Sequence, residues 1–97
     1  MGMRKYELMM IIDPTLSDAD RKTLLQEVTD ELASQQAKIL IDDQWGVKNL
    51  AYKIRASVTG YYVLYTLESE GQGFFEIAKS FNMKKAIWRH MFVRLED

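Results

Sequence analysis

The residues of this chain that are best suited to binding a ligand are basic. Lys48, Lys53 and Arg55 lie close together in the sequence, and Arg4 and Arg89 lie near its two ends. A lysine binds phosphate as a point charge and an arginine as a planar fork, and neither contact reads a base sequence. These five side chains are therefore candidate phosphate ligands. For any one of them, the alternative is an ordinary solvated surface charge.

The distribution of charge along the chain matters more than its sum. The net charge of −1 argues against indiscriminate binding to nucleic acid, which is typical of strongly basic domains. Acidic residues concentrate in residues 13–43 and 68–76, and basic residues in residues 4–5, 48–55 and 79–94. A nearly neutral protein of this kind can still present one basic side.

Catalytic and metal-binding chemistry find little support in the sequence. The chain has no cysteine, which excludes disulfides, thiolate metal sites and cysteine nucleophiles. His90 is the single histidine and has no carboxylate, serine or cysteine at a suggestive spacing. Asp42 and Asp43 are adjacent in an expected strand, so their carboxylates point to opposite faces and form a solvated edge. We predict that the protein is not an enzyme and needs no cofactor or metal.

Hydrophobic spacing divides the chain into six elements. The predicted strands are residues 6–12, 37–54, 61–67 and 87–95, and the predicted helices are residues 18–34 and 74–82. Ser17 is expected to cap the first helix, and Gly46 is expected to form a bulge in the long second strand. Residues 56–60 are predicted as a polar turn. The order βαββαβ predicts an α+β, ferredoxin-like fold with a four-stranded antiparallel sheet and two helices on one face.

The chain is expected to form a single domain. We place this domain at residues 3–95 and interpret Met1 and Gly2 as a cloning remnant, with Met3 as the natural start. No apolar run approaches the ~20 residues of a membrane-spanning helix, and the N-terminus does not resemble a signal peptide. We therefore expect a soluble, cytoplasmic protein.

The face of the sheet opposite the helices should be more apolar than an exposed face normally is. If Leu8 and Met10 face the helices, their neighbours on the first strand face away, and the same alternation applies to the third and fourth strands. The residues expected on this open face are Met9, Ile11, Tyr62, Leu64, Met91 and Val93. An apolar patch of several hundred Å², which these six residues could form, usually marks an interface, and we favour a protein partner. A homodimer or a terminal segment could cover it instead.

The aromatic residues divide between the core and the open face. Tyr61 and Tyr65 share the phase of the buried positions on the third strand and are expected in the core, which leaves Tyr62 alone on the open face. One free tyrosine is a weak match to the aromatic platforms of RNA-recognition domains. Trp45 and Trp88 are expected to be buried anchors with satisfied indole N–H groups.

Three segments together resemble one protein family. Residues 46–55 match the signature G-x-basic-polar-L-A-Y-x-I-basic of bacterial small-subunit ribosomal protein S6. The opening run R-K-Y-E at residues 4–7, followed by Asp13 and Pro14, resembles the family's first strand and turn. The run W-R-H-M-F-V-R at residues 88–94 resembles its last strand. The sequence departs from the family pattern at Val47, commonly basic, and at Lys53, commonly proline.

The resemblance implies a ferredoxin-like, non-catalytic structural component of the small ribosomal subunit, associated with ribosomes in the cytoplasm. Family members pair with ribosomal protein S18 and bind the central domain of the small-subunit ribosomal RNA (rRNA). We therefore expect Arg4, Lys48, Lys53, Arg55 and Arg89 to contact rRNA near one edge of the fold, and the apolar open face to dock S18. The alternatives are a ferredoxin-like homodimer that binds a small ligand or acts as a small enzyme, and a free-standing binder of single-stranded RNA.

Overall fold

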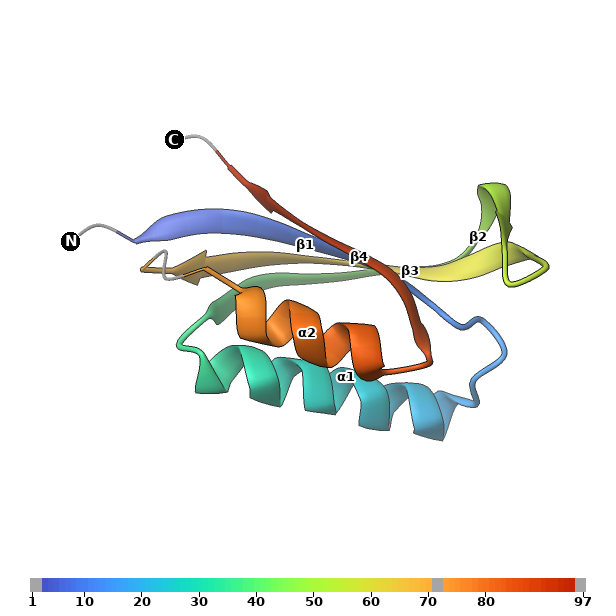
Figure 1. The fold of residues 1–97 in the computed structure, drawn as a ribbon, viewed down its shortest axis with the longest axis horizontal. Coiled ribbons are helices and arrows are strands. Elements are labelled where there is room, and N and C mark those ends of the chain that lie inside the picture. Colours follow the sequence, from blue (N-terminus) through green and yellow to red (C-terminus); the bar gives the residue numbers. More distant parts are fainter. Residues whose placement is uncertain (1–2, 71–72, 96–97) are drawn as a thin grey trace.

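The protein contains one antiparallel sheet with both helices packed on the same side (Figure 1). The computed structural model describes residues 3–70 and 73–95, so our interpretation of Met1 and Gly2 lies outside the described residues. The elements are β1 (Arg4–Ile12), α1 (Asp18–Ser34), β2 (Lys38–Ile54), β3 (Ser57–Ser69), α2 (Phe75–Met83) and β4 (Ile87–Arg94). The strand order is β2-β3-β1-β4. This confirms the predicted ferredoxin-like α+β fold.

Local sequence explains how the chain turns from β1 into α1. The Asp13 carboxylate accepts hydrogen bonds from the Thr15 amide and hydroxyl, at 2.8 and 2.7 Å, and stabilises a turn around Pro14. The Ser17 hydroxyl oxygen then accepts a hydrogen bond from the Asp20 amide at 3.1 Å, which caps α1 as predicted. The helix begins and ends at the predicted residues.

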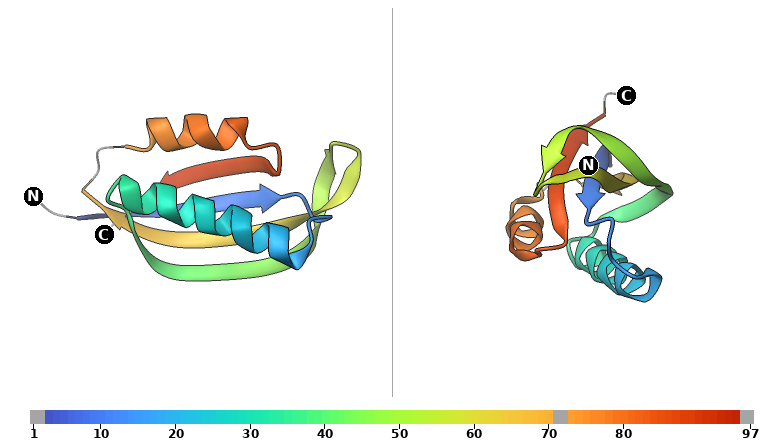
Figure 2. Two further views of the ribbon diagram at one scale, coloured as in Figure 1. Left: turned by 90° about the horizontal axis from the view of Figure 1, so that it is seen from below. Right: turned by 90° about the vertical axis from the view of Figure 1, so that its right-hand side faces the viewer.

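The core lies between the sheet and the two helices, which cover one face of the sheet in Figure 2. Leu8, Met10 and Ile12 of β1 are fully buried there, and so are Val63 and Leu67 of β3. The predicted phases of both strands are therefore confirmed. The helices contribute a second set of buried side chains, which includes Leu24, Leu25, Val28, Leu32, Ile77 and Phe81.

The connection between β2 and β3 is shorter than predicted. Ile54 pairs with Ser57, so the turn consists of Arg55 and Ala56 alone, with φ values of 51° and 64°. A two-residue hairpin needs such left-handed values because they match the twist of the strands. The predicted turn at residues 56–60 is therefore wrong, because this hairpin lacks the glycine or asparagine that normally signals it.

The bulge expected at Gly46 is present. The pairing of β2 with β3 shifts between Gln44 and Gly46, and Gly46 has a φ of +84°, which favours glycine. Two further shifts, between Ile39 and Ile41 and between Asn49 and Ile54, were not predicted. The segment from Ile41 to Gln44 is thus a short regular stretch between two bulges.

Candidate protein and RNA interface

The strand register gathers the six predicted open-face residues into one patch. Directly paired residues of an antiparallel sheet share a face. Met9 pairs with Leu64 on one side and with Met91 on the other. Ile11 of β1 likewise pairs with Tyr62 of β3. Met91 and Val93 are exposed, and the other four are half-buried because their neighbours in the patch partly cover them. We call these six residues the apolar patch.

Two further apolar residues extend the patch and were missed by the sequence reasoning. Ile41 pairs with Thr66 on the open face and is 56% exposed. Trp45 stacks on the ring of Tyr62, with ring centroids 6.4 Å apart, and is 49% exposed. Alternation from Ile39, which packs against the core, would have placed Ile41 on the core face, and the register shift between these residues turns Ile41 to the open face. Trp45 lies at the Gly46 bulge, where alternation breaks down.

The prediction for Trp45 is therefore half wrong. Its indole N–H donates to Asp43 Oδ2 at 2.8 Å, as expected, but the ring lies on the surface. Trp88 lies where the pairing of β1 with β4 shifts, and it is only half-buried. Tyr65 is in the core as predicted, and Tyr61 is half-buried and packs against the core.

The β2–β3 hairpin forms a wall at one end of the patch. In Figure 1 the last part of β2 arches above the sheet, on the side opposite the helices, before the chain turns into β3. Leu50 and Ile54 of the hairpin join Ile11, Tyr62 and Arg89 in lining a recess of about 190 Å³. Ile54 is only 5% exposed although it lies outside the main core. The hairpin is therefore packed against the open face.

Four of the five predicted phosphate ligands lie at this end of the sheet. Lys48 pairs with Gly60, and Lys53 and Arg55 follow on the hairpin. Arg89 pairs with Ile11 beside the recess, and its Nη1 donates to the carbonyl oxygen of Trp88 at 2.8 Å. All four side chains are exposed. We call these four residues the basic cluster.

Arg4 does not join the basic cluster. It pairs with Ser69 at the other end of β1, seven residues from Ile11, which places it roughly 23 Å away along an extended strand. The expectation that all five residues lie near one edge is therefore wrong for Arg4. The reason is topological, because Arg89 lies near the start of β4 and this strand runs antiparallel to β1.

Gly60 sets the position of the hairpin. A Cβ atom at this position would lie 2.5 Å from Ile11 Cγ2 and 3.2 Å from Leu50 Cδ2. We expect Gly60→Ala to lower the free energy of unfolding by about 1–3 kcal/mol, because the hairpin must move away from the open face. Urea denaturation measures the loss. Gly73→Ala is the control for the clash, because its φ of +87° imposes strain but a Cβ there meets nothing within 4 Å. An equal loss in both variants would contradict the packing role of Gly60.

His90 has a structural environment. Its ring contacts Phe81 and Phe92 edge-on, with centroids 5.4 and 6.2 Å apart, and burial lowers its pKa. The folded chain then binds fewer protons than the unfolded chain near pH 6.5, so stability should fall as the pH drops from 7.5 through 5.5. Urea midpoints across this range measure the effect. His90→Gln should flatten the profile, and an unchanged profile would contradict this assignment.

The two aspartates of β2 form an exposed edge, as predicted. Asp42 accepts a hydrogen bond from Gln44 Nε2 at 3.4 Å, and Asp43 is the acceptor for Trp45. Across residues 3–70 and 73–95, no three histidine, aspartate or glutamate side chains gather as metal ligands. In the same ranges, no helix has the length and apolar character needed to cross a bilayer.

The structure defines a ferredoxin-like protein whose open sheet face carries apolar side chains beside a group of exposed basic residues. The sequence model of the family described as ribosomal protein S6 matches residues 5–94. The small ribosomal subunit protein bS6 of Fusobacterium nucleatum is 37% identical over 92 residues, which cover 95% of this chain and 98% of the relative. The bS6 protein of Caldanaerobacter subterraneus is 30% identical over 98% of this chain and all of the relative. The chain belongs to the ribosomal protein S6 family.

Solved structures agree with this assignment. The crystal structure of 30S ribosomal protein S6 from Thermotoga maritima superposes with a TM-score of 0.91 at 25% identity, covering 97% of this chain and 89% of that one. The P2 domain of a chemotaxis kinase from the same organism reaches a TM-score of 0.61 at 11% identity and shares the fold alone. Members of the S6 family are structural ribosomal proteins, so the prediction that this chain is not an enzyme is confirmed.

Proposed function

We propose that this chain binds the central domain of the small-subunit rRNA together with ribosomal protein S18, as a structural component of the small ribosomal subunit. The observation that carries the proposal is that Ile11 and Tyr62 of the apolar patch and Arg89 of the basic cluster line the same recess. A partner seated on the patch would lie beside the phosphate-binding residues. Family membership supports the ribosomal role.

The charges around the patch favour a basic partner. Asp43 pairs with Leu64, and Glu7 pairs with Val93 and Thr66, so carboxylates lie among the apolar side chains on the open face. Complementary charge at the rim of an interface steers association and sets specificity. A small basic protein such as S18 would match these carboxylates and would supply the positive charge that this chain lacks. The joint surface would then bind RNA through phosphates and shape.

The proposal is tested by binding to a central-domain rRNA fragment, with and without S18, at two salt concentrations. We expect tight, salt-sensitive binding only when S18 is present. Tight binding by the chain alone would favour the free-standing RNA binder. No binding in either case, with both proteins folded, would favour the homodimer that binds a small ligand.

Arg89→Ala tests the basic cluster. If Arg89 contacts one phosphate, its removal should weaken binding of the complex to RNA and lower the slope of log K against log salt by about one. Filter binding over a salt series measures both quantities. Lys79→Ala is the matched control because Lys79 lies on α2, in the opposite layer, and equal effects of the two changes would contradict the assignment of Arg89. Arg4→Ala in the same assay shows whether RNA reaches the far end of β1.

A further inference from the structure

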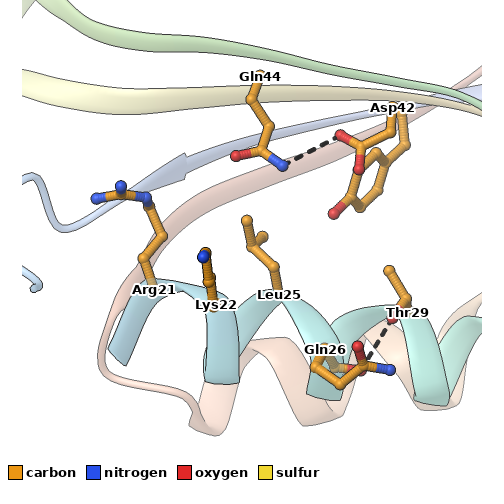
Figure 3. A pocket seen from close by; sticks show the side chains of 8 residues that line it. Arg21, Lys22, Leu25, Gln26, Thr29, Asp42 and Gln44 are labelled. Atoms are coloured by element: carbon orange, nitrogen blue, oxygen red, sulfur yellow. Dashed lines mark hydrogen bonds between the residues drawn. The ribbon is translucent and has the colours of Figure 1, made fainter. Parts of the chain in front are cut away.

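A groove on the other side of the molecule, between α1 and the outer edge of β2, has no role in the proposed function. Figure 3 shows Arg21, Lys22 and Leu25 of α1 on one side and Asp42 and Gln44 of β2 on the other. Its volume is about 360 Å³. Because the groove lies in the helix layer, it remains accessible when a partner covers the open face.

The backbone of β2 is available along this groove. The strand is hydrogen-bonded to β3 on one side and is the edge strand of the sheet on the other. An edge strand can accept a further strand through its unpaired N–H and C=O groups. The two bulges limit a regular ladder to the stretch from Ile41 to Gln44, so an added strand would pair over about four residues.

The side chains of the groove carry opposite charges at its two ends. Arg21 is held by the Asp18 carboxylate and by the Tyr61 ring, 4.4 Å from its guanidinium carbon, and Lys22 makes no ion pair with the described residues. Asp42 lies further along the groove, on the same face of β2 as Gln44 and two residues away from it. A strand paired with this stretch would direct alternate side chains toward the cationic and anionic ends.

The side chain of Tyr65 lies at the floor of the groove. Tyr65 is only 1% exposed and lines the groove, yet its hydroxyl makes no hydrogen bond with any described residue. Burial, followed by the nearby Asp42 carboxylate, raises the pKa of Tyr65, so the hydroxyl stays protonated and can donate. A backbone carbonyl group of a bound segment could accept this hydrogen bond.

We propose that the groove between α1 and β2 binds an extended peptide segment that pairs with β2 and carries an acidic and a basic side chain two residues apart. The acidic side chain lies toward Arg21 and Lys22, and the basic one lies against Asp42. The spacing of two follows from strand geometry, since residues i and i+2 of the peptide face the same side. This inference does not depend on the ribosomal role.

The experiment uses the full chain and two fluorescein-labelled hexapeptides of identical composition. The probe is Thr-Glu-Val-Lys-Val-Thr, and the control is Thr-Glu-Lys-Val-Val-Thr, in which the two charges fall on opposite faces. We expect fluorescence anisotropy to show at least fivefold tighter binding of the probe. Hydrogen exchange at residues 41–44 should slow when the probe binds, because the outward amides of β2 become paired. Equal affinities, or unchanged exchange at these amides, would overturn the proposal.

Three variants assign the binding to the groove. Asp42→Asn and Tyr65→Phe should each weaken probe binding about fivefold, since each removes one charged or hydrogen-bonding contact. Asp43→Asn is the matched control, because Asp43 is the neighbouring residue on the open face, and it should leave the affinity unchanged. An equal loss in Asp43→Asn would contradict the groove. Concentration-dependent self-association that protects the same amides without peptide would identify a second copy as the occupant and overturn the peptide proposal.

Discussion

Replacing Leu64 with aspartate is expected to abolish binding of S18 while leaving the fold intact. Leu64 is central to the apolar patch, where it pairs with Met9 of β1 and Asp43 of β2. A partner that covers this position would bury the new carboxylate beside the carboxylate of Asp43. An unpaired buried charge costs at least about 3 kcal/mol, which corresponds to more than a hundredfold loss of affinity. Isothermal titration of S18 into the variant measures the loss.

The free chain should tolerate Leu64→Asp because the side chain lies on the open face and is only half-buried. Circular dichroism and the thermal midpoint check the fold. Phe75→Asp is the matched control, since it makes the same kind of change at a residue of α2 that is 76% exposed in the opposite layer. S18 affinity that is unchanged in a folded Leu64→Asp protein would show that the partner does not dock on this face.

Replacing Phe81 with alanine is expected to lower the free energy of unfolding by about 3–5 kcal/mol. Phe81 is fully buried in α2, and its ring contacts Phe92 and His90 of β4, with centroids 6.3 and 5.4 Å apart. The loss is large because the cavity would open between a helix and an edge strand that few other contacts hold together. Urea denaturation at neutral pH measures it.

The same change should also weaken the proposed interface, because β4 carries Arg89, Met91 and Val93. Met83→Ala is the control on the same helix. Its side chain is 84% exposed, so its removal should change stability by less than about 0.5 kcal/mol. A loss below about 1 kcal/mol in Phe81→Ala would show that the aromatic contacts do not hold α2 against β4.

Alternation and helical spacing predicted most of this fold because they are local properties. The buried phases of β1 and β3 and the ends of α1 follow from which side chains share a face and from the Ser17 cap. Those phases also placed the six residues of the apolar patch, since a face left uncovered by both helices must be the opposite one. The motif at residues 46–55 predicted the family, which the comparisons confirmed.

Alternation failed where β2 departs from a regular strand. A bulge places two residues opposite one and turns the side chains that follow, so Trp45 lies on the open face rather than in the core. The turn at Arg55 and Ala56 was missed for a related reason, because both residues adopt left-handed φ values that their types do not signal.

Local sequence patterns were enough to predict the order of the elements, the face that each regular strand buries, and the residue types available for binding. Which of these residues lie close together depends on the folded arrangement of the strands. The direction of β1 separates Arg4 from Arg89, and the folded hairpin brings Leu50 and Ile54 onto Ile11. Strand register and hairpin packing depend on contacts between residues far apart in the chain, which no local pattern encodes.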